Sequence, residues 1–278
     1  MTRKERTRKK RTSDAAPPPE ERAAGGGEAA GGGEAAHLVV FSDVHGNLPA
    51  LRTFFDEIDS TAGIDAGVCC GDVVGYGAHP NECCQLVRER AIPCVLGNHD
   101  SVALNLAEIS FFNEIARAAA VWSHEHLEKT HADYLAGLPY ARSQAGLMFV
   151  HGSPANPEAW DYILNTGDAA DNFDAFDSWI CFVGHSHWPV VFEARGDGEA
   201  RCLRPGAVRL KRDRRYIVNV GSVGQPRDGD PRLCYVTVDR EANFLQYHRV
   251  PYPVSEAQRA IVEAGLPTGL AYRLAAGI

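Results

Sequence analysis

Long apolar runs are missing from the 278-residue sequence, and so are the cysteine spacings of a metal or disulfide scaffold. No stretch of about 18 residues is uninterruptedly apolar, so we expect no membrane-spanning helix. No apolar segment follows the basic N-terminus, which argues against a secretory signal. The eight cysteines form no C-x-x-C pair, and two vicinal pairs lie in apolar runs, so we expect free thiols that serve as small core residues. These absences favour a cytoplasmic protein.

Positive charge is scarce after residue 36. Residues 1–36 carry eight Lys and Arg and six Asp and Glu, which gives +2, whereas residues 37–278 carry the remaining 20 basic and 30 acidic residues, which gives −10. An acidic body with many Asp and His suits cation binding better than a broad nucleic-acid surface. A nuclease guided by the basic N-terminus is therefore disfavoured, since the rest of the chain has no basic stripe.

The first 36 residues have a composition that cannot bury apolar surface. A basic run over residues 3–11 is followed by three prolines, and Gly-Gly-Gly-Glu-Ala-Ala then occurs twice in succession. This composition predicts a disordered tail over residues 1–36. Contact of the tail with nucleic acid or an anionic surface is the alternative to a solvated tail. We expect residues 37–278 to form a single domain, whose oligomeric state the sequence does not indicate.

Apolar patterns with strand and helix periods follow one another along residues 37–278. The expected strands cover residues 37–42, 67–70, 92–96, 147–150, 180–183, 189–194, 216–220, 234–238 and 244–250. The expected helices begin near Asn47 and Pro80, fill most of residues 101–137, and close the chain over residues 255–264 and 270–276. This order predicts an α/β fold in which helices flank two stacked sheets.

Five short polar clusters each follow an apolar run. They are Asp43-Val44-His45-Gly46, Gly71-Asp72, Gly97-Asn98-His99-Asp100, His151-Gly152 and Gly184-His185-Ser186-His187. A strand delivers its C-terminal end to one edge of a sheet, so five such ends can converge on one site.

Carboxylates, imidazoles and neutral oxygens hold divalent metals of the Mn, Fe or Zn type. The clusters supply seven such donors, which are Asp43, His45, Asp72, Asn98, His151, His185 and His187. Seven donors are too many for one tetrahedral ion and suit two ions, which at roughly 3.5–4 Å apart need a shared anionic ligand. Asp72 is the candidate, because it is the lone carboxylate of its cluster and Gly71 permits close backbone approach. We expect His124, His126 and His131 to be solvated on a helical surface.

The order of the clusters resembles the calcineurin-like metallophosphoesterase superfamily. The pattern D-x-H, G-D, G-N-H-D, H-G, G-H-x-H extends over nearly all of residues 37–278. Residues 42–51, 71–77 and 221–227 resemble its small bacterial and archaeal phosphodiesterase-type members. The resemblance implies a four-layer α/β/β/α sandwich of two mixed sheets flanked by helices.

The resemblance also implies roles for the site residues. One metal ion would be bound by Asp43, His45 and His187, the other by Asn98, His151 and His185, and both by Asp72. The two divalent ions would be Mn, Fe, Zn, Ni or Co, with Mn²⁺ expected to support activity in vitro. A metal-bridging hydroxide would attack phosphorus in line, His99 would protonate the leaving oxygen, and Asp100 would orient His99. The implied activity is that of a metal-dependent phosphoric ester hydrolase.

Two arginines of the superfamily's protein serine/threonine phosphatases and diadenosine tetraphosphate hydrolases are missing. No Arg occurs in residues 71–77 or 100–103. A diester carries less charge than a monoester and needs less clamping, so we expect phosphodiesters or small phosphomonoesters as substrates. Arg117 or Arg227 would then contact the phosphate. The alternatives are a catalytically weak scaffold or interaction protein that keeps the fold, and a protein serine/threonine phosphatase-like enzyme.

Overall fold

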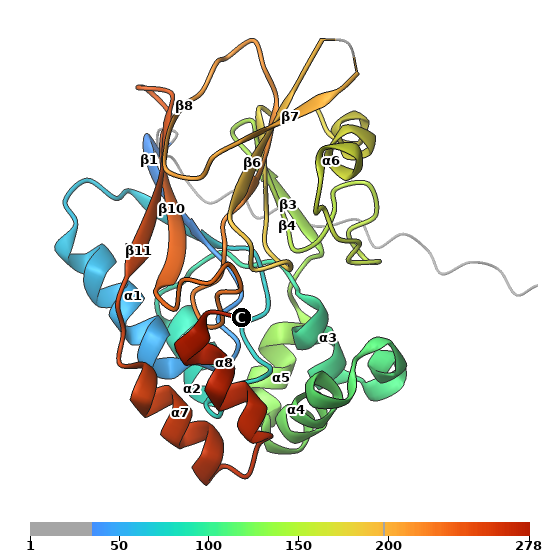
Figure 1. Ribbon diagram of the computed structural model, residues 1–278, viewed down its shortest axis with the longest axis vertical. Coiled ribbons are helices and arrows are strands. Elements are labelled where there is room, and N and C mark those ends of the chain that lie inside the picture. Colours follow the sequence, from blue (N-terminus) through green and yellow to red (C-terminus); the bar gives the residue numbers. More distant parts are fainter. Residues whose placement is uncertain (1–34, 197) are drawn as a thin grey trace, which may run out of the picture. The chain divides into compact units, whose positions relative to one another are not determined.

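The computed structural model describes residues 35–196 and 198–278. The tail predicted over residues 1–36 therefore lies, apart from Ala35 and Ala36, outside the described residues. The strands are β1 (His37–Phe41), β2 (Ala66–Cys69), β3 (Ala141–Gln144), β4 (Leu147–Val150), β5 (Ile180–Val183), β6 (Val190–Ala194), β7 (Ala200–Leu203), β8 (Ala207–Arg209), β9 (Tyr216–Asn219), β10 (Leu233–Asp239) and β11 (Phe244–Val250). Figure 1 shows their arrangement.

Helices form most of the remaining regular structure. The α-helices are α1 (Leu48–Ser60), α2 (Pro80–Glu89), α3 (Asn98–Leu104), α4 (Glu114–His126), α5 (Lys129–Ala136), α6 (Thr166–Asn172), α7 (Val254–Glu263) and α8 (Thr268–Ala276). Two 3₁₀-helices are η1 (Leu106–Phe111) and η2 (Phe173–Ala175). None of the helices in the described ranges is long and apolar enough to cross a membrane.

The strands form two mixed sheets. Sheet A has the order β2-β1-β10-β11-β8, and sheet B has the order β3-β4-β5-β9-β6-β7. Strands β1 and β2 of sheet A run parallel to each other. In sheet B, β5 runs parallel to both of its neighbours, β4 and β9. The other pairs are antiparallel. The parallel strands deliver their C-terminal ends to the sheet edges, where the polar clusters begin.

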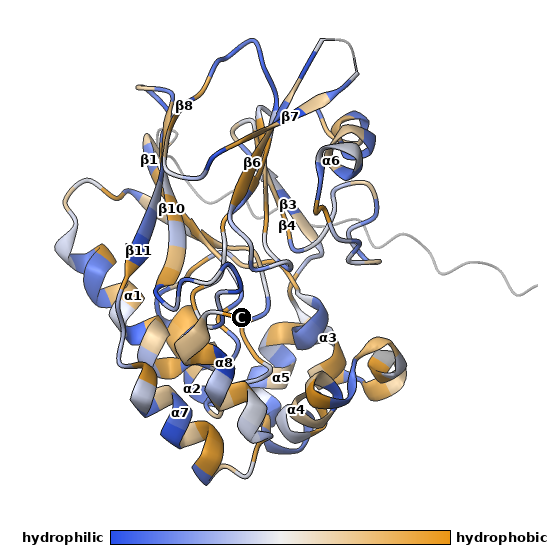
Figure 2. Cartoon of the chain, in the orientation of Figure 1, coloured by the Kyte–Doolittle hydropathy of each residue, from blue (hydrophilic) through white to orange (hydrophobic). Residues whose placement is uncertain are grey.

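Strand β1 shows how the layers are built. Its side chains alternate, so that Leu38 and Val40 pack between the two sheets while Val39 and Phe41 pack against helices. The run from 38 to 41 is therefore continuously apolar, because both of its faces are buried. Figure 2 shows the hydrophobic colour along β6, in the other sheet, whereas helix α7 alternates between hydrophobic and hydrophilic residues.

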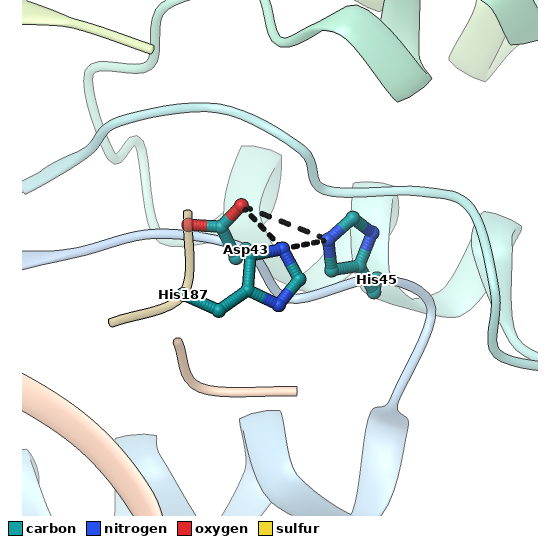
Figure 3. A group of neighbouring side chains, drawn as sticks. All are labelled: Asp43, His45 and His187. Carbon is teal, nitrogen blue, oxygen red and sulfur yellow. Dashed lines mark hydrogen bonds and ion pairs between the residues drawn. The ribbon is translucent and has the colours of Figure 1, made fainter. Parts of the chain in front are cut away.

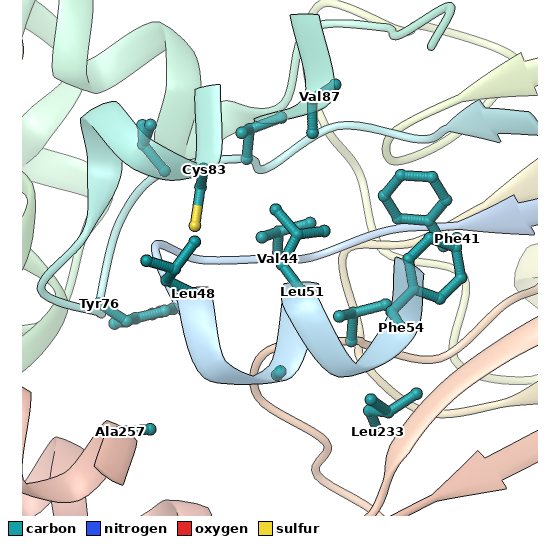
Figure 4. Packing of buried hydrophobic residues seen from close by; sticks show 14 of the residues in the cluster. Phe41, Val44, Leu48, Leu51, Phe54, Tyr76, Cys83, Val87, Leu233 and Ala257 are labelled. Atoms are coloured by element: carbon teal, nitrogen blue, oxygen red, sulfur yellow. The ribbon is translucent and has the colours of Figure 1, made fainter. Parts of the chain in front are cut away.

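Helices α1, α2, α7 and α8 cover the outer face of sheet A (Figure 1). Helix α1 begins where the Asn47 side chain accepts a hydrogen bond of 3.2 Å from the backbone of Ala50. Its residues Leu51 and Phe54 are fully buried in the cluster that Figure 4 shows, and the Phe54 ring lies 4.4 Å from that of Phe41. An apolar face at helical spacing therefore fixes α1 on sheet A.

Helix α6 and the segment after it cover the outer face of sheet B. Cys181 and Val183 of β5 pack there against Ala169 and Phe173. The alternate residues of β5, Ile180 and Phe182, face sheet A. The layers thus run helix, sheet A, sheet B, helix. The predicted four-layer α/β/β/α sandwich of two mixed sheets is confirmed.

Some local predictions need correction. Residues 92–96 were predicted as a strand but make only a single bridge, between Cys94 and Cys69 of β2. Pro93 has no N–H to continue the ladder, and the Leu96 N–H donates to Pro139 instead, at 2.8 Å. His131, predicted as solvated, is buried on α5, because that face of the helix packs inward.

Several elements were not predicted from the sequence. They are β3, β7, β8 and α6, all short or largely exposed, so their sequences show no clear apolar period. The cysteines were expected in the core, and seven of the eight are buried there as free thiols, with Cys202 exposed.

Candidate metal centre

The loops at one edge of both sheets bring the seven predicted ligands together. Asp43 and His45 follow β1, Asp72 follows β2, Asn98 begins α3, His151 follows β4, and His185 and His187 follow β5. All seven side chains are buried. Residues that are up to 144 positions apart in the chain, Asp43 and His187 (187 − 43), thus share one polar cluster inside the protein.

The backbone at these positions is unusual. Five of the seven residues have a positive φ: Asp43 (55°), His45 (51°), Asp72 (54°), His185 (65°) and His187 (58°). Among non-glycine residues, Asn, Asp and His adopt this conformation most readily. Such strained positions cluster at functional sites, because the surrounding structure must hold them.

Asp43, His45 and His187 form the first group (Figure 3). Asp43 Oδ1 lies 3.2 Å from His187 Nε2 and 3.6 Å from His45 Nε2. The two Nε2 atoms lie 3.0 Å from each other. Three ligand atoms therefore face a common point.

Asp72, His151 and His185 form the second group. His151 Nε2 lies 3.2 Å from both Asp72 Oδ2 and His185 Nδ1. It also lies 3.0 Å from Asn98 Oδ1. This group therefore combines one carboxylate, two imidazoles and one amide oxygen.

Asp72 lies between the two groups. Its Oδ1 accepts a hydrogen bond of 2.8 Å from the backbone N–H of His99. Its Oδ2 is buried without a hydrogen-bond partner among the described residues, 3.6 Å from His45 Nε2 in one group and 3.2 Å from His151 Nε2 in the other. A buried carboxylate oxygen without a partner is costly unless a cation neutralises it.

Backbone carbonyls fix the rings of three histidines. His45 Nδ1 donates to Val74 at 3.2 Å, His151 Nδ1 to Cys70 at 2.8 Å, and His187 Nδ1 to Gln225 at 2.6 Å. Because a carbonyl can only accept, each neutral ring carries its hydrogen on Nδ1 and presents a lone pair on Nε2. The lone pairs of His45 and His187 then face each other, an arrangement that a cation between them stabilises. The site therefore fits metal ions.

The pKa shifts keep the two carboxylates ionised and two of the histidines neutral, which are the forms that bind a cation. Burial is the largest single influence on the Asp72 carboxyl and raises its pKa. His151 and the other nearby histidines together outweigh burial, so the pKa lies below its usual range. The pKa of Asp43 is lowered in the same way, chiefly by His187 against the effect of burial. Burial lowers the pKa of His185 and of His187 to about 3. Burial also acts to lower the pKa of His151, but Asp72 raises it to about 9.

His99 borders this cluster and is held by aromatic contacts. Its ring lies 4.3 Å from that of Tyr76, 4.6 Å from that of Phe112 and 4.9 Å from that of His45. Burial lowers its pKa well below the usual range, and its Nδ1 has no partner among the described residues. A ring nitrogen of His99 also forms a close group with His45 and Asp72, so the geometry admits a ligand as well as a proton donor.

The hydrogen bonds that Asp100 makes to the described residues go to the backbone, and none of them goes to the His99 ring that it is expected to orient. Its carboxylate instead accepts hydrogen bonds from the backbone N–H groups of Val74, at 3.0 Å, and Gly97, at 3.1 Å. The reason is its place in the first turn of α3, where an acidic side chain folds back onto the helix start. Asp100 therefore ties the Asn98 loop to the Asp72 loop, and burial raises its pKa to about 7.

The two candidate arginines occupy different settings. The Arg227 guanidinium lies 5.6 Å from the Tyr76 ring and donates to Gln225 Oε1 at 2.9 Å. Its Nε is buried without a partner among the described residues. Arg117 is exposed and donates to the Phe112 carbonyl at 3.3 Å. Of these two arginines, only Arg227 therefore lies beside the metal cluster.

Sequence patterns gave no sign of a second arginine and a group of aromatic rings near the cluster. The guanidinium of Arg273, on α8, lies 5.8 Å from the Tyr76 ring that Arg227 also contacts. Tyr162 stacks on His185 with ring centres 3.9 Å apart. Neither residue lies in a motif with a recognisable spacing, so only the fold could place them here.

The calcineurin-like phosphoesterase superfamily domain matches residues 37–243. The chain belongs to the calcineurin-like phosphoesterase superfamily. The resemblance read from the five clusters is thereby confirmed. In general terms the protein is a metal-dependent phosphoester hydrolase, with clustered His and Asp groups that can hold metal.

Individual relatives of this phosphoesterase extend over most of the chain. An uncharacterized protein from Methanocaldococcus jannaschii, MJ0912, is 35% identical over 244 residues, which are 86% of this chain and 98% of that protein. The crystal structure of a metallophosphoesterase from Sphaerobacter thermophilus is 40% identical, with a TM-score of 0.76, and the match covers 88% of this chain and 100% of that one. The protein PH1004 from Pyrococcus horikoshii, at 18% identity, shares the fold with a TM-score of 0.69 over 86% of this chain and 97% of that one.

Proposed function

We propose that this phosphoesterase uses two divalent metal ions to hydrolyse phosphodiester or small phosphomonoester bonds. The observation that supports this best is the buried Asp72 Oδ2, which has no partner among the described residues and faces His45 and His151 at 3.6 and 3.2 Å. A ligand shared by two ions about 3.5–4 Å apart is expected in such a position.

Each ion has its own set of ligands in this proposal. Asp43, His45 and His187 would hold one, Asn98, His151 and His185 the other, and Asp72 both. Bound ions would supply neutralisation of phosphate charge and activation of a water molecule for in-line attack on phosphorus. Mn, Fe, Zn, Ni and Co all suit this donor set, and Mn²⁺ is our choice for assays. The protein keeps the rings in place through the Nδ1 hydrogen bonds to backbone carbonyls.

His99 would protonate the leaving oxygen. Two observations support the assignment: the ring borders the cavity beside the metal cluster, and its Nδ1 has no partner among the described residues. A neutral imidazole still carries one N–H that can donate. The rings of Tyr76 and Phe112 would position it, while Asp100 would hold the loop from which it projects.

Arg227 and Arg273 would contact the phosphate. Both guanidinium groups lie against Tyr76, whose ring also packs on His45 at 4.6 Å. Arg227 donates to Gln225 Oε1 at 2.9 Å, and Arg273 Nε donates to the Ile278 oxygen at 2.8 Å. A guanidinium has five N–H donors, so each arginine has further donors for a phosphate. These two arginines would supply the charge that the absent motif arginines provide in other members. Arg117 has no such position.

Asp72→Asn tests the proposal. Wild-type protein should hydrolyse bis-p-nitrophenyl phosphate with Mn²⁺, and Asp72→Asn should hold fewer than two ions per chain after chelation and reloading, because the shared charge is lost. Asp133→Asn is the control, since that carboxylate is exposed and pairs only with Lys129 among the described residues. Two ions per chain in Asp72→Asn, measured by elemental analysis, would contradict the bridging role.

The same assay addresses the alternatives. A wild-type protein with two ions and no turnover on any ester would favour a scaffold. Rapid turnover of phosphoproteins in preference to small esters would favour a protein phosphatase. We retain the cytoplasm as the proposed location and residues 37–278 as the catalytic domain.

A further inference from the structure

A cavity of about 430 Å³ opens beside the metal centre. Asn98, His99 and His185 are among its lining residues, so a group bound there lies next to the phosphate that the metal centre would hold. The volume is within the range of small-molecule sites, about 300–1,000 Å³. The cavity is therefore large enough for part of a substrate.

Aromatic rings from three segments form much of the lining. They are Tyr76, Phe111, Phe112, Trp160 and Tyr162. Core packing does not explain all of them, because Phe111 is 85% exposed and Tyr162 is 49% exposed. Trp160 has a φ of 51°, a strained conformation of the kind found where a ligand is held. These rings offer flat faces to a planar group.

Charge in the cavity is sparse. No Lys or Arg is among the described residues that line it, and Glu158 is the single acidic side chain there. A polyphosphate or an acidic peptide would gain nothing from such a lining, whereas an uncharged ring loses little on leaving water. Asn113 adds a polar edge: its Oδ1 accepts from Ala116 at 2.9 Å, which leaves the amide NH₂ as a donor.

We propose that this cavity binds the base of a nucleoside, so that the substrates are phosphate esters of nucleosides. The inference rests on the proposed phosphoesterase function. Stacking between rings accounts for the aromatic walls, and the Glu158 carboxylate and Asn113 amide can meet the donors and acceptors at the edge of a base. With the base in the cavity, the ester oxygen of the sugar lies on the side of His99.

Binding of adenosine, which carries no phosphate, tests the cavity without metal or turnover. Adenosine should change the fluorescence of Trp160, and ribose at the same concentration should not. Trp160→Phe should remove that change, while saturation-transfer NMR should still detect adenosine on the variant. An equal response to ribose, or binding of octyl glucoside in place of adenosine, would overturn the proposal.

Phe111→Ala examines the aromatic wall. Removing this exposed ring should weaken adenosine binding roughly five- to a hundredfold, the range for loss of one ring stacked on a base. Tyr272→Ala is the matched control, because Tyr272 is 75% exposed on α8 and does not line the cavity. Melting temperatures of both variants check their folding. Unchanged adenosine binding in a folded Phe111→Ala would contradict the proposal.

Turnover separates this inference from the proposed function. Adenosine 5′-phosphate and ribose 5-phosphate contain the same ester bond and differ by the base. The Mn²⁺ enzyme should favour the nucleotide at least fivefold in kcat/KM, and Phe111→Ala should reduce that ratio. Equal turnover of both esters would refute the nucleobase subsite and leave the phosphoesterase intact. Adenosine binding without turnover of any ester would refute the phosphoesterase and leave the subsite intact.

Discussion

Existing hydrogen bonds limit which side-chain atoms of the metal centre can bind a cation. Nδ1 of His45, His151 and His187 is bonded to backbone carbonyls, so Nε2 is the nitrogen left for a cation. Asp72 Oδ1 accepts a hydrogen bond from the backbone of His99, so Oδ2 is the oxygen left for a cation. The hydrogen bonds around the ligands therefore select which atoms face the metal positions.

His99→Ala separates proton donation from metal binding. General acid catalysis is worth about 10²–10⁴-fold where the leaving oxygen needs the proton. The variant should keep both ions, slow p-nitrophenyl esters modestly, since p-nitrophenolate leaves without a proton, and slow alkyl or nucleoside esters by far more. Kinetics on both ester types and elemental analysis give the readout. Equal losses on the two types, or loss of an ion, would show that His99 is not the acid.

Gly97→Ala should disturb Asp72 without removing any ligand. A Cβ at position 97 would overlap Oδ1 and the backbone nitrogen of Asp72. We expect weaker metal retention after dialysis and at least a tenfold loss of turnover. Gly137→Ala is the control, because its Cβ would lie 3.5 Å from the nearest atom, an ordinary contact. Full metal retention in Gly97→Ala would show that the loop can move to accept the methyl group.

At the scale of elements, helix α8 and the loop after β9 bring positive charge to the site. Arg273 lies on α8, beyond the residues matched by the family domain, and Arg227 lies in the loop. Burial lowers the pKa of Arg273, and the charge of Arg227 lowers it further, as expected of two cations held close together. A phosphate between or beside them would relieve that repulsion.

Replacement of these arginines should raise KM for phosphate esters. Hydrogen bonds to charged groups contribute about 1.5–3 kcal/mol, so Arg227→Ala and Arg273→Ala should each raise KM roughly ten- to a hundredfold. Arg117→Ala is the matched control and should show wild-type KM, since its guanidinium is exposed and bonded to Phe112. Unchanged KM in both test variants would end the assignment.

The whole molecule depends on the two sheets packing against each other. Ligands from sheet A (Asp43, His45, Asp72) and from sheet B (His151, His185, His187) meet only because residues such as Val40 and Phe182 hold the sheets together. The metal centre is thus a property of the sandwich rather than of either sheet. Loss of inter-sheet packing would separate the residues of each candidate metal-binding group.

Deletion of residues 1–34 should leave the domain unchanged. Their composition cannot contribute a packed face, and the family domain begins at residue 37. Ala35 and Ala36 stay in the deletion variant, because the Ala36 carbonyl accepts from the backbone of Arg240 at 2.9 Å. We expect the melting temperature and the turnover of a small ester to match the full chain. A fall of more than a few degrees would contradict this.

The sequence by itself determined the candidate metal-binding cluster and most of the fold. Asp72, Asn98 and the G-H-x-H histidines stand in short motifs directly after apolar runs, so local pattern and strand polarity were enough to bring them together. The strands with both faces buried, β1 and β5, were equally clear, because burial on both sides demands continuous apolar residues.

Only the tertiary structure decided the surroundings of the ligands. The partners of Asp100, the burial of His131 and the reduction of residues 92–96 to a single bridge depend on what each packs against, not on their own sequence. Arg273 and the rings of Trp160 and Tyr162 come from segments with no motif, and they reach the site through side-chain packing between elements. Local sequence encodes backbone periods and ligand types, whereas contacts between distant segments arise only when the layers pack.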